Sequence, residues 1–216
     1  MATPVARTLV RVDIDTQHGF CDPTGALYVR NAETALPNVR RLNEDAARRG
    51  IWLIGSVDAH DYATPEFKEN GGIWPVHCVK GTWDQLKVEE TLPPRYRFVP
   101  PVPCDVARLF DGGKAALYFE KDAYSVAANP NFAPFLDYLC GRVGGAERLA
   151  FQVYGVATDY CVRMGALELR RRLPLADVAV VIDATAGVAP DTTEDALRAF
   201  REGGVRIIAS TPEALG

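Results

Sequence analysis

The stretch Leu149-Ala-Phe-Gln-Val-Tyr154-Gly155-Val-Ala-Thr-Asp-Tyr-Cys161 joins an apolar run to a cysteine that follows a turn. The run predicts a buried strand over 149–154, and the apolar spacing beyond the cysteine predicts a helix over 162–172. Cys161 is therefore expected close to a helix N-terminus, where the macrodipole and free N–H groups lower the pKa of a thiol. A nucleophile needs such an environment, although a lone cysteine is more often a small buried apolar residue.

Strands and helices alternate on both sides of this stretch. Apolar patterns predict further strands over 8–15, 51–57, 115–119, 178–182 and 205–208, and helices over 34–49, 131–139 and 192–202. This alternation predicts an α/β fold, a three-layer sandwich in which a central, mostly parallel sheet is flanked by helices on both faces. With 216 residues, the chain is expected to form a single domain over 1–216. Residues 58–112 lack periodicity and are expected to be irregular and functional.

Charge and apolar pattern argue against several classes of protein. The formal net charge of −4 argues against a nucleic-acid-binding surface. No apolar stretch approaches the length of a membrane span and the first residues lack a signal-peptide core, so a cytoplasmic protein that binds no membrane is expected. The five cysteines show no CxxC spacing, which argues against a disulfide framework and a cysteine zinc cluster.

Polar residues follow several of the predicted strands. Asp15, Asp58 and Lys121 fall at carboxyl ends of strands, as does the turn before Cys161. Ligands of open parallel sheets bind beyond these ends, so the four residues are expected to meet at one edge.

Two of these residues are candidates for activating the thiol of Cys161. Asp15 would act as its general base, and the charge of Lys121 would lower its pKa. Each also has a structural alternative, a turn cap for Asp15 and a solvated surface position for Lys121. Asp13 is a rival base, because residues two apart on a strand point to the same side.

The segment Asp58-Ala-His60 predicts a metal site, since a carboxylate and an imidazole two residues apart on an extended segment can share one cation. The loop that contains His77 offers a second imidazole. Two histidines and one carboxylate suit zinc, iron(II) or manganese. Glu66 is a possible fourth ligand and Glu69 a weaker candidate.

Aromatic residues accompany the candidate site. Phe20 and Trp74 are the candidates for substrate contact, either stacking on a flat ring or simply belonging to the core. His18 has no partner at metal-ligand spacing, so a structural role is expected for it.

Taken in order, these motifs resemble the nicotinamidase branch of the isochorismatase-like cysteine hydrolases. The motifs are Asp15-Thr-Gln17…Phe20, Asp58-Ala-His60, Trp74-Pro-Val-His77-Cys-Val-Lys-Gly-Thr82, Lys121 and Ala157-Thr-Asp-Tyr-Cys161-Val. The resemblance implies a catalytic triad of Cys161, Asp15 and Lys121. It also implies an oxyanion hole made by the backbone N–H groups of Ala157 and Cys161. It also implies a cis peptide bond at Val156–Ala157. A divalent metal, with zinc first and iron or manganese as alternatives, would be bound by Asp58, His60 and His77, with Glu66 standing where some members place a further ligand.

The activity that the resemblance implies is deamidation of nicotinamide to nicotinate and ammonia through a cysteine thioester. The metal would hold the pyridine ring between Phe20 and Trp74, the cellular role would be NAD salvage, and the chain would self-associate as a homo-oligomer. Lys121-Asp122-Ala-Tyr124-Ser125-Val-Ala127 departs from the family, which often has a glycine after the lysine and an aromatic residue after the Tyr-Ser pair.

Two other functions remain open. The departing segment borders the substrate in the family, so the first of them concerns the identity of the substrate. One is a related cysteine hydrolase acting on another small amide, carbamoyl or ureido substrate, and bound metal would discriminate against it. The other is a member without activity that uses the cleft for binding. The presence of every expected triad residue argues against the second function.

Overall fold

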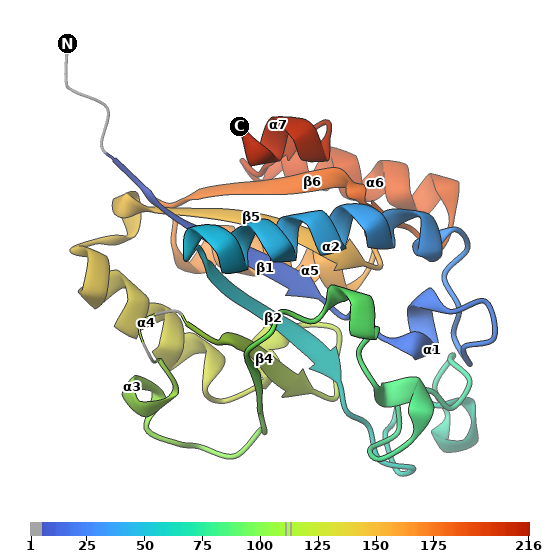
Figure 1. The fold of residues 1–216 in the computed structure, drawn as a ribbon. Helices are drawn as coiled ribbons and strands as arrows, with labels where there is room; N and C mark the ends of the chain where they lie inside the picture. The colour runs from blue at the N-terminus through green and yellow to red at the C-terminus, as the bar shows by residue number, and fades with distance from the viewer. Residues whose placement is uncertain (1–5, 111, 113) are drawn as a thin grey trace.

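The computed structural model describes residues 6–110, 112 and 114–216 and places a seven-stranded sheet between two layers of helices (Figure 1). The strands are β1 (Thr8–Ile14), β2 (Trp52–Asp58), β3 (Tyr96–Val99), β4 (Ala116–Lys121), β5 (Leu149–Val156), β6 (Asp177–Ala186) and β7 (Arg206–Ile208). Their order across the sheet is β3-β4-β2-β1-β5-β6-β7, and all pairings among them are parallel. The predicted α/β sandwich with a mostly parallel sheet is confirmed.

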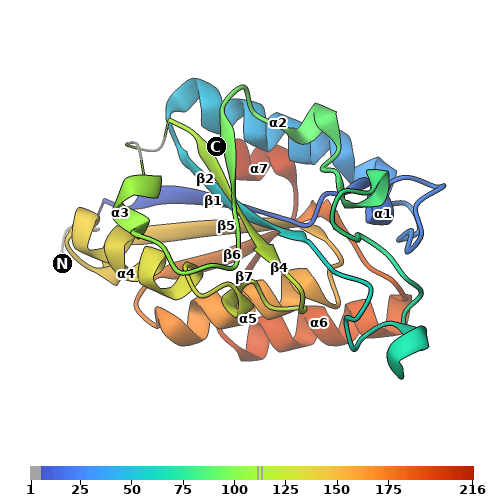
Figure 2. The ribbon, with the colours of Figure 1, turned by 90° about the horizontal axis from the view of Figure 1, so that it is seen from below.

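Helices cover both faces of this sheet (Figure 2). One face carries α2 (Ala32–Arg49) and α7 (Thr211–Leu215), and the other carries α4 (Phe132–Val143), α5 (Cys161–Arg172) and α6 (Pro190–Glu202). The short α3 (Val106–Leu109) packs on α4, and α1 (His18–Cys21) follows β1. Single 3₁₀ turns lie at Lys68–Asn70, Trp83–Gln85, Glu89–Thr91, Val126–Ala128 and Ala146–Arg148. None of the helices in the described ranges is long and apolar enough to cross a membrane.

The two faces of β1 pack against different layers. Val10, Val12 and Ile14 belong to the larger apolar core, which lies between the sheet and the α4–α6 layer. The alternate residues Arg11 and Asp13 point to α2 and form hydrogen bonds with its residues. The strand thus has an apolar side and a polar side, although both are buried.

Arg11 offers a test of the polar side. Its fully buried guanidinium donates to Asp45 Oδ2 at 2.7 Å and to the Leu42 carbonyl at 3.2 Å. Removing one partner of a buried ion pair leaves an uncompensated charge. We therefore expect Asp45→Ala to lower the free energy of unfolding by about 3–5 kcal/mol in a denaturant titration. Asp195→Ala removes an exposed ion pair with Arg198 and should change the free energy of unfolding little. Equal losses of unfolding free energy in the two variants would contradict this account.

The expectation that residues 58–112 are irregular is wrong at several short elements, above all at the edge strand β3. Residues 96–98 are exposed and only Val99 is buried, so burial does not alternate along this strand of four residues. It forms because it pairs with β4, in the register Tyr96↔Ala116 to Val99↔Phe119. The sequence also does not predict α1, α3 and α7, which are too short to show a helical period.

Candidate active site

Neighbouring strands deliver polar residues to one edge of the sheet. Asp15 follows β1, Asp58 and Lys121 end β2 and β4 as direct register partners, and Cys161 begins α5 after β5. The Lys121 Nζ atom lies 2.8 Å from Asp15 Oδ2 and 3.6 Å from Cys161 Sγ, and it also contacts Asp58 Oδ1. The structure therefore brings together the aspartate, the lysine and the cysteine that the sequence singles out.

Asp13 does not join this group. The backbone at Asp15 has φ of 49°, so the alternation of the strand does not continue to it. Asp13 instead lies under α2, 2.8 Å from Lys87 Nζ, and it accepts a hydrogen bond from Asn43 at 2.7 Å. Asp15 accepts from the Ser56 hydroxyl at 2.7 Å. The expectation that Asp13 and Asp15 share a side is wrong, and Asp13 is excluded as the base.

The thiol environment differs from the one expected. Burial raises the pKa of Cys161 well above its usual value, and the positive charge of Lys121 opposes this only in part. The expected lowering of the thiol pKa is therefore wrong, and the resting thiol carries its proton. Burial also raises the pKa of Asp15 despite the nearby Lys121, which makes its carboxylate a stronger base.

Two charges of opposite sign stabilise each other beside this thiol. Burial alone would lower the pKa of Lys121, but Asp15 and Asp58 raise it well above its usual value. Burial alone would raise the pKa of Asp58, but Lys121 and His60 lower it to about 2. The ammonium and the Asp58 carboxylate are therefore charged at neutral pH.

A cluster of metal-ligand atoms adjoins Asp58. One atom each from Asp58, His60 and His77 lies within 4.8 Å of the others. Glu66 Oε1 lies 3.4 Å from His60 Nε2 and 3.3 Å from His77 Nε2, within reach of the same cation. Glu69 is exposed and takes no part in the cluster. All four predicted ligands are thus brought together.

The two imidazoles are oriented for ligation. His77 Nδ1 donates to the Pro75 carbonyl at 2.8 Å, so Nε2 is the ring nitrogen directed at Glu66 and at the ligand cluster. Burial alone would lower the pKa of His77, but its contacts with Glu66 and Pro75 raise it, so this corner favours positive charge. His60 is fully buried, and neither ring nitrogen has a hydrogen-bond partner among the described residues.

A divalent cation fits this donor set. A buried imidazole without a hydrogen bond is costly, and a cation shared by His60 Nε2 and the nearby carboxylates of Asp58 and Glu66 would offset this cost. Nitrogen and carboxylate ligands are those that zinc, iron(II) and manganese take. His18 lies outside this cluster. Its Nε2 is 3.0 Å from Glu89 Oε2 and its ring stacks on Trp83, in agreement with its expected structural role.

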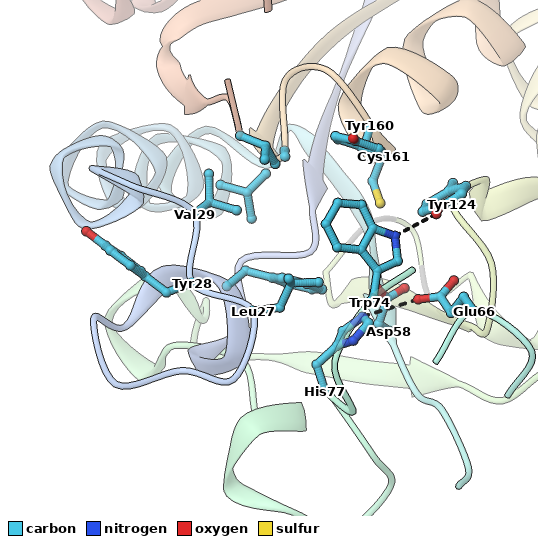
Figure 3. A pocket seen from close by; sticks show the side chains of 14 residues that line it. Leu27, Tyr28, Val29, Asp58, Glu66, Trp74, His77, Tyr124, Tyr160 and Cys161 are labelled. Carbon is cyan, nitrogen blue, oxygen red and sulfur yellow. Dashed lines mark hydrogen bonds and ion pairs between the residues drawn. The ribbon is translucent and has the colours of Figure 1, made fainter. Parts of the chain in front are cut away.

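Cys161 lines one cavity together with Asp58, Glu66 and His77 of the ligand cluster, and the Cys161 sulfur points into it (Figure 3). The Trp74 indole N–H donates to the Tyr124 hydroxyl at 2.7 Å, and the indole packs edge-on against Tyr160. Phe20 packs edge-on against the ring of His77. Leu27 and Val29 lie on the far side of the cavity from Glu66 (Figure 3), and Val156 and Val188 add to its apolar lining. A lining of this kind, mostly apolar and aromatic with a few polar groups, suits a small ring.

The turn before Cys161 is anchored by a residue that the sequence did not single out. The Asp159 carboxylate accepts from the N–H of Val188 at 3.0 Å, from the N–H of Ala189 at 3.3 Å and from the Thr192 hydroxyl. These bonds tie the turn to the start of α6. The signal for this role was weak, because a single aspartate in a turn is common.

The same turn presents free backbone donors. Gly155 has φ of 113°, and a Cβ there would lie 2.0 Å from the Ile14 carbonyl oxygen, so only glycine fits. The Val156–Ala157 peptide bond is cis, as the resemblance implies. Within the described ranges no acceptor is found for the N–H of Ala157 or of Cys161, and both residues line the cavity. These two N–H groups are therefore available to a ligand.

Comparisons with known proteins identify the family. No family model matches the chain. The chain is 30% identical over 215 residues to the nicotinamidase/pyrazinamidase of Mycobacterium tuberculosis, covering 95% of this chain and 100% of the relative. The structure is similar to that of a pyrazinamidase of Pyrococcus horikoshii in complex with zinc, with a TM-score of 0.72, 26% identity and coverage of 93% of this chain and 98% of that one.

A third protein, PnC1 from L. infantum in complex with nicotinate, has the same fold, with a TM-score of 0.73 and 21% identity over 99% of this chain and 98% of that one. The likeness to the M. tuberculosis relative runs along almost the whole chain, including the sheet edge at which Lys121 contacts Asp15, Asp58 and Cys161. The chain belongs to the nicotinamidase/pyrazinamidase family of hydrolases.

Proposed function

We propose that this protein hydrolyses nicotinamide to nicotinate and ammonia, with Cys161 as the nucleophile. The observation that carries the proposal is one cavity with a buried thiol beside the Asp15–Lys121 pair and a cluster of metal ligands nearby. The name of the M. tuberculosis relative supports this substrate.

Asp58, His60 and His77 would hold a divalent ion, with Glu66 as a fourth ligand. We propose zinc, which the P. horikoshii neighbour binds, with iron(II) or manganese as alternatives. When bound, the ion would supply an electrophilic position for the pyridine nitrogen, which would place the carboxamide near the thiol. Phe20 and Trp74 would pack against the ring.

In the first half-reaction, Asp15 takes the thiol proton of Cys161 and the sulfur attacks the carboxamide carbon, forming a C–S bond. The negative charge moves to the amide oxygen, which faces the N–H groups of Ala157 and Cys161. Losing one such donor typically costs roughly 3–4 kcal/mol of transition-state stabilisation. Lys121 holds Asp15 in place and balances its charge.

Loss of ammonia completes the first half-reaction by forming the thioester, and hydrolysis of the thioester is the second half-reaction. Asp15 returns its proton to the amide nitrogen, the C–N bond breaks and ammonia leaves. Asp15 then takes a proton from a water molecule that attacks the thioester carbon. The C–S bond then breaks, Asp15 gives its proton to the leaving sulfur, and the acid ionises and leaves as nicotinate, which restores the Cys161 thiol and the Asp15 carboxylate.

Ammonia release from nicotinamide by the zinc-loaded protein is the direct test, run beside an N-carbamoyl amino acid as the competing substrate class. Release from nicotinamide at a kcat/KM well above that of the carbamoyl compound is the expected result. Release from the carbamoyl compound alone would refute nicotinamide as the substrate. The segment after Lys121, which contains Tyr124, would then be the place to look for the difference.

Tyr124 provides a separate prediction about binding. Tyr124→Phe keeps the ring and removes the hydroxyl that accepts from the Trp74 indole. One hydrogen bond contributes about 0.5–1.5 kcal/mol, so we expect KM for nicotinamide to rise by roughly two- to tenfold and kcat to change less. Tyr62→Phe, on an exposed tyrosine, is the control. A fall in kcat with KM unchanged would show that the pair acts on the chemical step instead.

A further inference from the structure

We propose that Gln17 is a positioning residue that holds Asp58 in place for the metal centre. The inference rests on the proposed metal site and extends it by one residue beyond the ligands. Gln17 is fully buried, and its Nε2 donates to the carbonyl oxygens of Asp58 at 2.8 Å and Gln85 at 2.7 Å. Its Oε1 accepts from the N–H of Asp58 at 2.7 Å. One side chain thus binds both backbone groups of Asp58.

The sheet explains why Asp58 needs this support. On one side Asp58 pairs in register with Lys121 of β4. On the other side the pairing between β1 and β2 ends at Ile14 and Ser56, two residues before Asp58. The Gln17 amide supplies there a donor and an acceptor, as the backbone of a neighbouring strand would. The end of β2 is therefore fixed on both sides.

Small displacements of Asp58 would affect two sets of contacts at once. One carboxylate oxygen contacts the Lys121 ammonium, and the other lies 3.5 Å from His60 Nε2. Gln17 also joins Asp58 to Gln85, so it links β2 to the loop that carries the 3₁₀ turn at residues 83–85. Residues that orient metal ligands typically change metal affinity by roughly 10–100-fold when they are replaced.

The test measures zinc affinity without any substrate. Gln17→Met keeps the length of the side chain and removes its donor and acceptor. Competition with a chelating dye, on protein stripped of metal, should give a zinc Kd weaker by roughly 10–100-fold than in the native chain. Gln17→Glu keeps an acceptor for the Asp58 N–H but loses the amide donor, and it should weaken zinc binding in the same direction if the methionine variant does not fold.

Asn131→Leu is the matched control. Asn131 is also a buried amide with the same bonding pattern, donating to the carbonyls of Pro100 and Val102 and accepting from the N–H of Cys104. None of these groups lies in the cavity or the ligand cluster. The control should lose a comparable amount of thermal stability and keep the native zinc Kd.

The outcomes separate this inference from the proposed reaction. An unchanged zinc Kd in the Gln17 variants, equal weakening in Asn131→Leu, or no zinc binding by the native protein would each overturn it. Ammonia release is measured independently, so a protein that binds zinc through Gln17-supported Asp58 and leaves nicotinamide intact would refute only the proposed substrate.

Discussion

Cys161→Ala should reduce ammonia release from nicotinamide by roughly 10³-fold or more, because no other described thiol lies beside Asp15 and Lys121. Without the sulfur the thioester cannot form. The variant then has the oxyanion donors to stabilise the transition state but no nucleophile to attack the carboxamide. The substitution is small, so the core that surrounds the first turn of α5 is expected to keep its packing. The loss should therefore appear in kcat, in steady-state assays of zinc-loaded protein.

Zinc content and melting temperature make this result specific. Both should stay close to native values in Cys161→Ala, because the predicted ligands are Asp58, His60, His77 and Glu66. Cys21→Ala is the matched control, since the Cys21 thiol is also buried, with its pKa raised to about 12 by burial, and does not line the cavity. Turnover that survives in Cys161→Ala, or metal lost with the sulfur, would contradict this division of roles.

His77→Ala should weaken zinc binding by more than about 100-fold, because even residues that only orient ligands change metal affinity by roughly 10–100-fold. Removing the imidazole takes away one nitrogen ligand and leaves Glu66 without one of its two histidine neighbours. We expect protein purified with equimolar zinc to retain little metal after dialysis, as measured by elemental analysis, and to release ammonia slowly in proportion.

His18→Ala is the control for this change. His18 lies at the start of α1, bonded to Glu89 and stacked on Trp83, outside the ligand cluster. It should leave zinc content at the native level. If His77→Ala binds zinc as tightly as the native chain does, His77 is not a ligand and the cluster has to be reassigned.

Support for the metal centre from the structure is electrostatic as well as geometric. Contacts with Glu66 and Pro75 raise the pKa of His77 against the effect of burial, and His60 has two unpartnered ring nitrogens within the described residues. A site that favours positive charge and holds unsatisfied lone pairs is stabilised when a cation binds. Zinc binding is therefore expected to raise the melting temperature of the protein.

Local sequence patterns predicted much of this fold. Central parallel strands are buried on both faces, so β1, β2, β4, β5 and β6 each contain an apolar run that is visible without a structure. Carboxyl ends of parallel strands share one edge, so placing Asp15, Asp58, Lys121 and Cys161 at strand ends was enough to predict that they meet. The edge strand β3 was missed, because its pairing with β4 and not its own pattern makes it a strand.

The sequence by itself therefore determined the alternation of strands and helices and the set of residues at the sheet edge, because both follow from local apolar period and from strand order. Tertiary structure alone decided three features of the site. The positive φ at Asp15 turns its side chain away from that of Asp13. Burial by distant segments raises the pKa of Cys161. The Gln17 amide bonds to Asp58 and Gln85, which lie 41 and 68 positions further along the chain. Each depends on atoms far apart in the chain, and no pattern of neighbouring residues reports their distance.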